Sequence, residues 1–584
     1  MVELADLIRP GSRRGLDFVI PEELRKRTGI PSYKILTFAV SEMLANSLDT
    51  NTTEIHVEVK TVGEFDELTV RDSGTRKISI EDLKLILDFE NKASSKRGFL
   101  RVSRGYLGNA LKCIFGYSYA LAEASKLIPP EILVNSHGTE YRINLKPDKV
   151  KESIDSEITV KETESTGFNS FTVRFPIDRS WTRGYLREDT DEPILELDSI
   201  HSVLFASGMV NPTRRLTYKL WGYSEGELGE PTETPPLRQD TSILWYEPKQ
   251  FETLFYDFVR ARPETQLREF MSLFRGFSSK KIQKVIKEKL QELNDAGDHD
   301  SQGGGNVQFF PTAQIKNLSR EVVKRLYTIM GERAKPIAKR SISKVLGAVG
   351  KENFERFREQ REWKRLRYTL KKGQEKTVFD FDFKFVSFPF LIELAVFDRD
   401  EDERGLKVFQ AVNFSASMED LFSKIFDIRY RLGRVGITER SAVTVLAHLV
   451  CPVLGWLNYG KSGLIGSRTT TELMRKAFDE ILPVPKTPKI YRPPPPPKPV
   501  SWVPSGKLSN NKYRNRLFDF AQEIRAIDAG RTKRIKYSAR GWCYALEGLG
   551  LIDKGEFSKA QTAIKTTAES WDFYPSTSWP KTRI

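Results

Sequence analysis

Along the first half of the chain, apolar residues alternate between helical and strand-like spacing. Apolar positions in Tyr33–Asp49 recur every three or four residues, which predicts an amphipathic helix. Its buried stripe would consist of Leu36, Ala39, Val40, Met43, Leu44 and Ser47. In Glu54–Val62, Glu67–Arg71 and Ser170–Phe175, apolar and polar residues alternate as in half-buried strands. The pattern predicts an α+β protein.

The second half of the chain continues this mixture before it turns helical. Phe251–Leu293 is mostly helical, Phe379–Phe385 and Phe390–Phe397 are strand-like, and Thr470–Leu482 has helical spacing. Three short helices are expected near the C-terminus, at Asn511–Ile527, Ala539–Leu549 and Ser558–Ser570. We therefore expect an α+β region followed by a small helical module.

Two segments without apolar periodicity divide the chain. Pro483–Pro504 contains ten prolines in 22 residues, which favours polyproline II and a semi-rigid spacer. Such a run can also be a ligand for a proline-binding domain. Asp295–Asn306 is rich in Gly and Asp, which is typical of a loop. For 584 residues, about three to five domains are expected.

Composition narrows the class of protein. Three cysteines, Cys113, Cys451 and Cys543, are far apart and form no CxxC pair, which argues against a disulfide scaffold or a structural zinc site. No window approaches the roughly 18 uninterrupted apolar residues of a membrane-spanning helix. The first 14 residues lack the apolar region of a secretory signal. We expect a cytoplasmic protein without a membrane part.

Positive charge is concentrated near the C-terminus. The net charge is +15, and Val484–Arg540 carries 14 Lys and Arg against three Asp and Glu, a net +11. A basic block of this kind attracts phosphate backbones, so double-stranded DNA is an expected partner. On charge alone, a solvated basic linker is an equally good interpretation.

The first predicted helix carries three side chains suited to chemistry. Glu42, Asn46 and Asp49 are four and three residues apart, so they share one edge of the helix. A carboxylate, an amide and a second carboxylate could act as a base, a metal ligand and an orienting group. Taken alone, such a ridge is more typical of an ordinary solvated face.

Two glycine-containing segments follow. Asp72 and Gly74 come directly after the strand Glu67–Arg71, where a carboxylate can meet a ligand and glycine allows close backbone approach. After a lysine-rich stretch, Gly105–Lys112 places two glycines before a helical run. Free backbone amides at a helix N-terminus suit phosphate.

In this order, the three segments resemble the motifs of the GHKL ATPase superfamily, which includes DNA gyrase, the heat-shock ninety chaperones and histidine kinases. That family has ExxxNxxD on a helix, DxGxG after a strand, a lid, and GxxGxG before a helix. This chain has Arg76 in place of the second glycine of DxGxG and Ala110 in place of the last glycine of GxxGxG. The resemblance implies the Bergerat α/β sandwich fold and an ATPase with ATP and Mg2+ as cofactors.

The resemblance also implies roles for individual residues. Glu42 would be the general base that activates the attacking water, Asn46 would hold Mg2+ through its carbonyl oxygen, and Asp72 would accept the adenine amino proton. The other nucleotide-binding residues would be Asp49, Gly74, Gly105, Gly108, Asn109, Ala110, Lys112 and Thr172.

Later segments resemble one branch of the superfamily, the ATP-binding B subunits of topoisomerase VI. Gln266–Val285 resembles their helix-two-turns-helix insert. Pro389–Glu393 and Phe409–Phe414 resemble strands of their transducer domain, with Asn413 where that family has Asn. Lys461 lies in a Gly-rich segment before a helix, as the family's switch lysine does, which implies that it reaches the γ-phosphate. A surface lysine in a turn is the alternative.

The C-terminal segment shows a second resemblance. Ser538–Tyr544 (SARGWCY) resembles the S-x-R-x-x-Y-Y turn in the winged-helix domain of the DNA-cleaving chain of topoisomerase VI, with Tyr544 at the nucleophile position. A winged helix in which this ring only packs is the interpretation we favour. The residues up to Ile584 leave no room for the acidic Toprim domain that strand cleavage needs. Cleavage would therefore use a partner chain.

Together these observations predict five regions and a function. The regions are a GHKL ATPase domain (1–245), a helical insert (246–365), a transducer-like domain (366–482), a Pro-rich basic linker (483–510) and a winged-helix-like DNA-binding module (511–584). The expected function is that of a type IIB topoisomerase-like B subunit, an ATP-driven homodimeric clamp on double-stranded DNA that acts at the nucleoid with a Toprim partner. One alternative is a GHKL clamp in genome defence or chromosome handling without strand passage. Another is a non-catalytic DNA-binding scaffold with a degenerate nucleotide pocket, which the presence of Arg76 favours.

Overall fold

The structure, a computed structural model, divides the chain into two compact units, Met1–Pro483 and Val484–Ile584. It describes residues 15–90, 99–103, 109–164, 166–177, 186–187, 190–193, 195–231, 241–262, 264–295, 315–379, 384–418, 420–423, 425–456, 464–465 and 467–483, all in the first unit. Gly105, Gly108, Lys461, Tyr544 and the basic linker with its predicted C-terminal helices lie outside the described residues.

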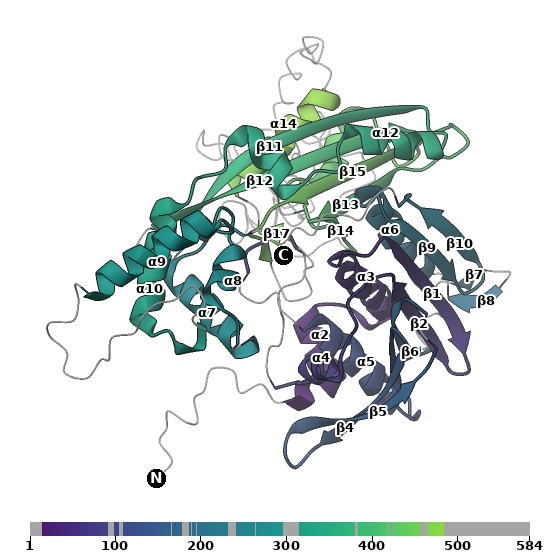
Figure 1. The fold of residues 1–584 in the computed structure, drawn as a ribbon. Helices are drawn as coiled ribbons and strands as arrows, with labels where there is room; N and C mark the ends of the chain where they lie inside the picture. Colours follow the sequence, from purple (N-terminus) through teal and green to yellow (C-terminus); the bar gives the residue numbers. More distant parts are fainter. Residues whose placement is uncertain are drawn as a thin grey trace, which may run out of the picture. The chain divides into compact units, whose positions relative to one another are not determined.

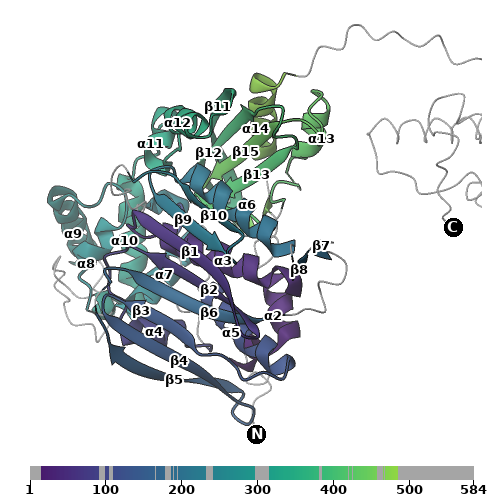
Figure 2. The same cartoon turned by 90° about the vertical axis from the view of Figure 1, so that its right-hand side faces the viewer.

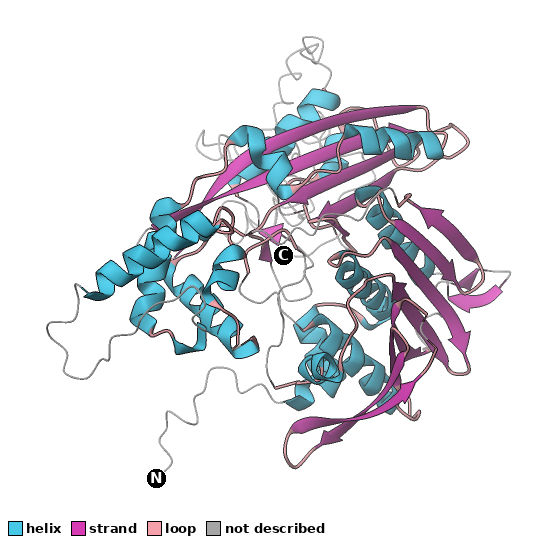
Figure 3. Cartoon of the chain, in the orientation of Figure 1, coloured by secondary structure: helices cyan, strands magenta, loops and turns pink. Residues whose placement is uncertain are grey.

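An eight-stranded sheet forms the N-terminal part of the first unit (Figures 1 and 3). Its strands lie in the order β10-β9-β1-β2-β6-β3-β4-β5. The pair β1–β9 is parallel and the other neighbouring pairs are antiparallel. The strands are β1 (Glu54–Val62), β2 (Phe65–Asp72), β3 (Ile132–Ser136), β4 (Thr139–Asp148), β5 (Ser153–Glu162), β6 (Asn169–Pro176), β9 (Arg215–Leu220) and β10 (Ser224–Leu228). A separate ribbon pairs β7 (Leu186–Arg187) with β8 (Thr190–Pro193).

Helices α3, α5 and α6 lie on one face of this sheet (Figure 2). The helices of this part are η1 (Gly15–Val19), α2 (Pro21–Thr28), η2 (Ser32–Lys34), α3 (Ile35–Leu48), α4 (Ile80–Ile86), α5 (Ala110–Ala124) and α6 (Leu195–Val210). In β1 every second residue from Ile55 to Val59 is buried, as expected when one face packs on helices. The predicted helix Tyr33–Asp49 and the first three predicted strands are confirmed.

A helical region follows the sheet. It contains η4 (Ile243–Trp245), α7 (Pro248–Ala261), α8 (Leu267–Ser272), α9 (Lys280–Asp295), η5 (Ile315–Asn317), α10 (Arg320–Arg333), η6 (Lys339–Ser341), α11 (Ile342–Leu346) and α12 (Lys351–Gln360). Aromatic rings hold α7 and α8 together, with Phe251 5.9 Å from Phe270 and 5.7 Å from Phe274 between ring centroids. The helical prediction for Phe251–Leu293 is confirmed.

A five-stranded sheet in the order β11-β12-β15-β13-β14 completes the unit. Its strands are β11 (Arg365–Phe379), β12 (Lys384–Asp398), β13 (Lys407–Val412), β14 (Ser415–Ala416) and β15 (Val443–Val450). It is accompanied by α13 (Ile428–Gly433), α14 (Arg468–Ile481) and the short pair β16 (Gly455–Trp456) and β17 (Leu464–Ile465). Helix α14 packs against β11 and β12, whereas α6 of the first sheet packs against β13 and β14. Every residue of β15 is buried.

Two sequence predictions for this sheet are confirmed and one is wrong. Phe390–Phe397 lies inside β12, and the helix predicted at Thr470–Leu482 is α14. Phe379–Phe385 is not a strand of its own, because Phe379 ends β11 and pairs with Lys384, the first residue of β12. Periodicity alone does not show where one strand of a hairpin stops and the next begins.

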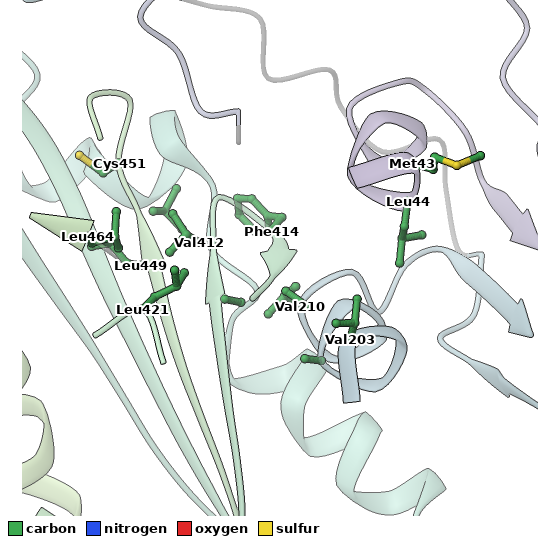
Figure 4. Close-up of a cluster of buried hydrophobic side chains, with 14 of the residues drawn as sticks. Met43, Leu44, Val203, Val210, Val412, Phe414, Leu421, Leu449, Cys451 and Leu464 are labelled. Carbon is green, nitrogen blue, oxygen red and sulfur yellow. The ribbon is translucent and has the colours of Figure 1, made fainter. Parts of the chain in front are cut away.

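Both sheets share one hydrophobic core. Figure 4 shows Leu44 of α3 and Val203 and Val210 of α6 in the same buried cluster as Val412 and Phe414 at the end of β13. The α+β class predicted from the sequence is confirmed, with two mostly antiparallel sheets and packed helices. None of the helices in the described part of the chain has the length and apolar character that crossing a bilayer requires.

Candidate functional site

Helix α3 carries Glu42 and Asn46 of the predicted ridge, and Asp49 is the C-cap of the helix. The environment of the ridge differs from the predicted one. Of the 14 residues of α3, 12 are buried, so apolar contact surrounds the helix instead of following one stripe. Glu42 is only 4% exposed, which contradicts the interpretation of the ridge as a solvated face. Asn46 and Asp49 are partly buried. A buried carboxylate needs specific partners to offset its lost hydration, so this position requires an interaction that solvent does not provide.

Arg214 holds the C-terminal end of α3. Its guanidinium donates hydrogen bonds to the backbone carbonyls of Leu48 and, at 3.2 Å, Thr50. A cation at this end of a helix interacts favourably with the helix dipole. Burial lowers the pKa of Arg214 to about 10, and the charges of Asp49 and Asp72 act in the opposite direction. Arg214 lies in the turn between α6 and β9, and no local sequence motif marks it.

Asp72, the last residue of β2, lies against the same end of α3. Ser47 Oγ donates to Asp72 Oδ2 at 2.8 Å, and the backbone N–H of Gly74 donates to Oδ1 at 2.9 Å. Asp72 is 8% exposed. A Cβ atom at residue 74 would lie 2.7 Å from Asp72 Oδ1, so any larger residue here would displace the Asp72 carboxylate. The Ser47–Asp72 hydrogen bond therefore places the Asp72–Gly74 motif next to the C-terminal end of the helix motif.

Residues of β6, of the end of β3 and of the β3–β4 connection form hydrogen bonds that fix the turn after Asp72. Asn169 Nδ2 donates to the carbonyl oxygens of Gly74 at 2.9 Å and Arg76 at 3.2 Å, and Ser136 Oγ donates to Asn169 Oδ1 at 2.6 Å. His137 Nε2 lies 2.8 Å from the Gly74 carbonyl oxygen. None of these supporting residues was identified from the sequence. Asn169 is opposite Asp72 in the β2–β6 register, and that pairing leaves no local sequence signal.

Arg76, the main departure from the DxGxG pattern, lies on the surface. Its guanidinium pairs with Asp82 at 2.5 Å, and its side chain is 70% exposed. Asp82 in turn forms a capping box with Ser79 at the start of α4. In this structure the guanidinium is therefore held at α4, while Gly74 occupies the close-packed position beside Asp72.

Thr172 is not brought together with Asp72. It pairs with Thr69, three residues before Asp72 on β2, and the two hydroxyl oxygens are 2.9 Å apart. Successive side chains of a strand point to opposite faces. Asp72 faces α3, so Thr172 faces away from the helices.

The start of α5 is where the glycine motif predicts it. Asn109, which directly follows Gly108 in the sequence, is the N-cap of α5, and Ala110 is its first helical residue. Lys112, by contrast, is 1% exposed, and its ammonium group donates to the backbone carbonyl of Asp88. Lys112 therefore anchors the segment after α4 in this structure.

Residues 99–103, which precede the glycine motif, are held by distant parts of the chain. The Leu100 N–H donates to Tyr246 Oη at 2.6 Å, and Thr241 Oγ1 donates to the Leu100 carbonyl at 2.6 Å. Asn413 Nδ2 donates to the Ser103 carbonyl at 3.0 Å. Burial lowers the pKa of Arg101, and the negative charge of Asp49 opposes that effect. This segment thus connects the site with the helical region and the second sheet.

Comparisons with known proteins give only distant structural similarity. No protein-family model and no curated protein matches the chain. Among solved structures, the chain is similar to an N-terminal domain of a DNA repair protein, with 11% identity, coverage of 76% of this chain and 93% of that one, and a TM-score of 0.35.

Two gyrase structures give similar values. The 43K ATPase domain of Thermus thermophilus gyrase B, solved with an aminocoumarin, shows 10% identity, coverage of 80% and 91%, and a TM-score of 0.29. The gyrase B subunit of Myxococcus xanthus shows 10% identity, coverage of 81% and 93%, and a TM-score of 0.30. Similarity at this level does not establish a function, so the site geometry has to support one.

Proposed function

We propose that this chain is a Mg2+-dependent ATPase of the GHKL type. The observation that carries the proposal is the position of Asp72, a buried carboxylate at the end of β2, directly against the helix that bears Glu42, Asn46 and Asp49. These residues are 23 or more positions from Asp72 in the sequence. The resemblance to the family predicts that they lie close to Asp72 in the fold.

Asp72 has the acceptor capacity that recognition of adenine needs. Each carboxylate oxygen has two lone-pair positions, and each accepts one hydrogen bond here, from Ser47 Oγ or from the Gly74 amide. The exocyclic amino group of adenine is a donor that fits such an acceptor. Guanine has a carbonyl oxygen at that position, which a carboxylate repels, so the site would select ATP over GTP.

Glu42 and Asn46 would act on the phosphate side. Glu42 would accept a proton from the attacking water, and its burial keeps bulk solvent away from that proton transfer. The Asn46 carbonyl oxygen is a hard ligand of the kind that Mg2+ prefers, and the ion would neutralise charge on the phosphates. The described residues contain no cluster of three His, Cys, Asp or Glu side chains suited to a metal. A Mg2+ site built mainly from nucleotide phosphates and water needs none.

Substitution of the proposed base tests the ATPase assignment. Glu42→Gln should lower ATP turnover by ~10²–10⁴-fold, the usual loss for a general base, while ATP affinity stays close to that of the wild type. Glu196→Gln is the matched control, because Glu196 contacts the first turn of the same helix at Thr37 and lies away from the ridge. Turnover should be followed by phosphate release and affinity by calorimetry. Wild-type turnover in Glu42→Gln would exclude Glu42 as the base.

We further propose the role of a type IIB topoisomerase-like B subunit. ATP would close two copies of the chain into a clamp on double-stranded DNA, and a separate Toprim chain would cleave it. The support is the resemblance of the segments around Gln266–Val285, Pro389–Glu393 and Asn413 to that family, together with the net +11 of Val484–Arg540. Covalent DNA adducts with a Toprim partner would separate this role from a clamp without strand passage.

Removal of the basic region tests the DNA part of the proposal. Truncation after Leu482 should weaken DNA binding and flatten its salt dependence, because fewer phosphates are neutralised. ATP binding should persist, since the site is built from residues before the linker. Fluorescence anisotropy at several salt concentrations would measure both effects. Unchanged affinity and salt slope would place the DNA contacts on the first unit instead.

A further inference from the structure

Asn413 joins two backbone segments that are far apart in sequence. Its side chain is buried, at 3% exposure. Asn413 Nδ2 donates to the carbonyl oxygens of Ser103 at 3.0 Å and Cys451 at 2.9 Å, and Asn413 Oδ1 accepts from the Cys451 N–H at 2.8 Å. One amide therefore connects the end of the 99–103 segment with the end of β15. Each contact uses the polarity of an amide, so no other side chain of this size fulfils all three.

The backbone at Asn413 shows that the position is built for this side chain. Asn413 has a φ of 50° and Phe414 a φ of 63°. Left-handed conformations are unfavourable for residues with a Cβ, although Asn tolerates them better than most. The turn is supported by Asn211 Nδ2, which donates to the Phe414 carbonyl at 2.8 Å, and by His448 Nε2, 3.2 Å from the Phe414 amide. Two successive residues in this region store strain that the surrounding contacts must offset.

In the sequence, each segment that Asn413 joins precedes a residue that the family resemblance assigns to the nucleotide site. Ser103 is two residues before Gly105, and Arg101 is close enough to Asp49 for their charges to interact. Cys451 is ten residues before Lys461. Because Ser103 belongs to the first sheet's part of the unit and Cys451 to the second, the amide sets the relative position of the two parts at this point.

We propose that Asn413 is a positioning residue for ATP hydrolysis, which acts through the Ser103 carbonyl and the Cys451 peptide without touching the nucleotide. This inference rests on the proposed ATPase function. Its physical basis is that a displacement of about 1 Å between reacting groups can lower a rate by ~10²-fold. A purely stabilising role for Asn413 would lower the folded fraction and leave each folded molecule fully active.

The test compares Asn413→Gly with Asn211→Ala. Glycine accepts the φ of residue 413 without strain, so this variant removes the amide and keeps the turn. Asn211→Ala removes a hydrogen bond to the same turn and leaves Ser103 and Cys451 untouched. Turnover is measured per ADP-binding site, well below the melting temperature of each variant. We expect kcat of Asn413→Gly to fall roughly 10- to 100-fold while its Kd for ADP changes less than about 2-fold. Asn211→Ala should keep the wild-type kcat.

Hydrogen exchange without nucleotide provides a readout that does not depend on ATPase activity. The Cys451 amide loses its acceptor in Asn413→Gly, so the peptides around residues 99–103 and 451 should exchange faster than in Asn211→Ala. Wild-type kcat per site in Asn413→Gly, with faster exchange at both segments, would overturn the positioning role and leave the proposed function intact. A wild-type chain that neither binds nor hydrolyses ATP would overturn the proposed function itself. Equal loss of kcat in both variants would show that the turn, and not the Asn413 amide, is what matters.

Discussion

Asp72 and Glu393 are buried carboxylates on the two sheets, and their surroundings are opposite in kind. Asp72 accepts hydrogen bonds from two donors among the described residues, Ser47 and Gly74. Glu393 accepts from four: the amides of Val349 and Gly350 at 2.9 Å each, Tyr368 Oη at 2.8 Å and His448 Nδ1 at 3.0 Å. A list of polar residues would give both carboxylates equal weight as site candidates.

The number of hydrogen bonds that each carboxylate accepts distinguishes Asp72 from Glu393. Glu393 is 1% and His448 0% exposed, and the four donors fill the acceptor positions of the carboxylate. Burial would raise the pKa of Glu393, but the hydrogen bonds that it accepts from His448, Gly350 and Val349 outweigh burial and lower that pKa. Among the described residues, only two donors reach Asp72, so its carboxylate at the end of β2 has further acceptor capacity. A saturated buried carboxylate stabilises the fold, whereas one with spare acceptor capacity is suited to bind a ligand.

The largest expected effect is on the free energy of unfolding, when the Glu393 carboxylate is removed. Glu393→Ala leaves four donors without this acceptor, two of them fully buried, and breaking such a buried network typically destabilises by ~3–5 kcal/mol. Urea unfolding measures the change. The control is Glu359→Gln, because Glu359 is 68% exposed and pairs with Arg358 at the surface. A destabilisation as small as that of the control would mean that Glu393 is not saturated and that the comparison fails.

Asp72→Asn should have the next largest effect, on binding instead of folding. Asparagine still accepts from the Gly74 amide, but its amide NH2 would face the amino group of adenine. We expect ATP affinity to fall by about 100-fold, or ~2.7 kcal/mol, and unfolding to change little. Calorimetry measures the affinity, and Thr172→Val is the control, since Thr172 lies on the other face of the sheet. An equal loss of ATP affinity in Asp72→Asn and Thr172→Val would argue against a nucleotide contact at Asp72.

A third buried carboxylate, Glu196, should have a smaller effect, on how the free energy of unfolding depends on pH. It accepts from the Thr37 N–H at 2.7 Å and Thr37 Oγ1 at 2.9 Å, and burial raises its pKa from 4.5 to about 7. Since the folded state binds the proton more tightly than the unfolded state, this group reduces stability as pH rises from about 4.5 to 7, by ~1–3 kcal/mol. Glu196→Gln should remove that part of the pH dependence. Urea unfolding of the wild type and Glu196→Gln at pH 5 and pH 8 tests this prediction. The same change of unfolding free energy with pH in both proteins would contradict the raised pKa of Glu196.

Local patterns predicted the elements and the order of the motifs well. The spacing of Glu42, Asn46 and Asp49 predicted one helix, and the structure places the first two on α3 and Asp49 at its C-cap. Asp72 falls at the end of a strand as the sequence suggests. Burial was predicted less well, because helical periodicity does not show how many neighbours surround α3. Each of these predictions depends only on residues close together in the chain.

Long-range pairing accounts for the residues that were missed or misplaced. Thr172 was assigned to the site from the family resemblance, but the β2–β6 register places it on the face away from Asp72. Asn169 and Arg214 reach the site because β6 and β9 join the sheet beside β2 and β1. The bond from Asn413 to Ser103 spans 310 residues. Periodicity carries no information about such register and pairing.

The parallel pairing of β1 with β9 has a consequence for the nascent chain. All the motif residues up to Lys112 leave the ribosome before Arg214, which follows α6 and directly precedes β9. At ~5–20 residues per second, β1 remains an unpaired edge for roughly 8–30 s after it is made. Such an edge can pair with other chains, so this interval is a window for aggregation and chaperone capture. The eight-stranded sheet is therefore completed only after about the first 230 residues have been made, as α6, Arg214 and β9 take their places.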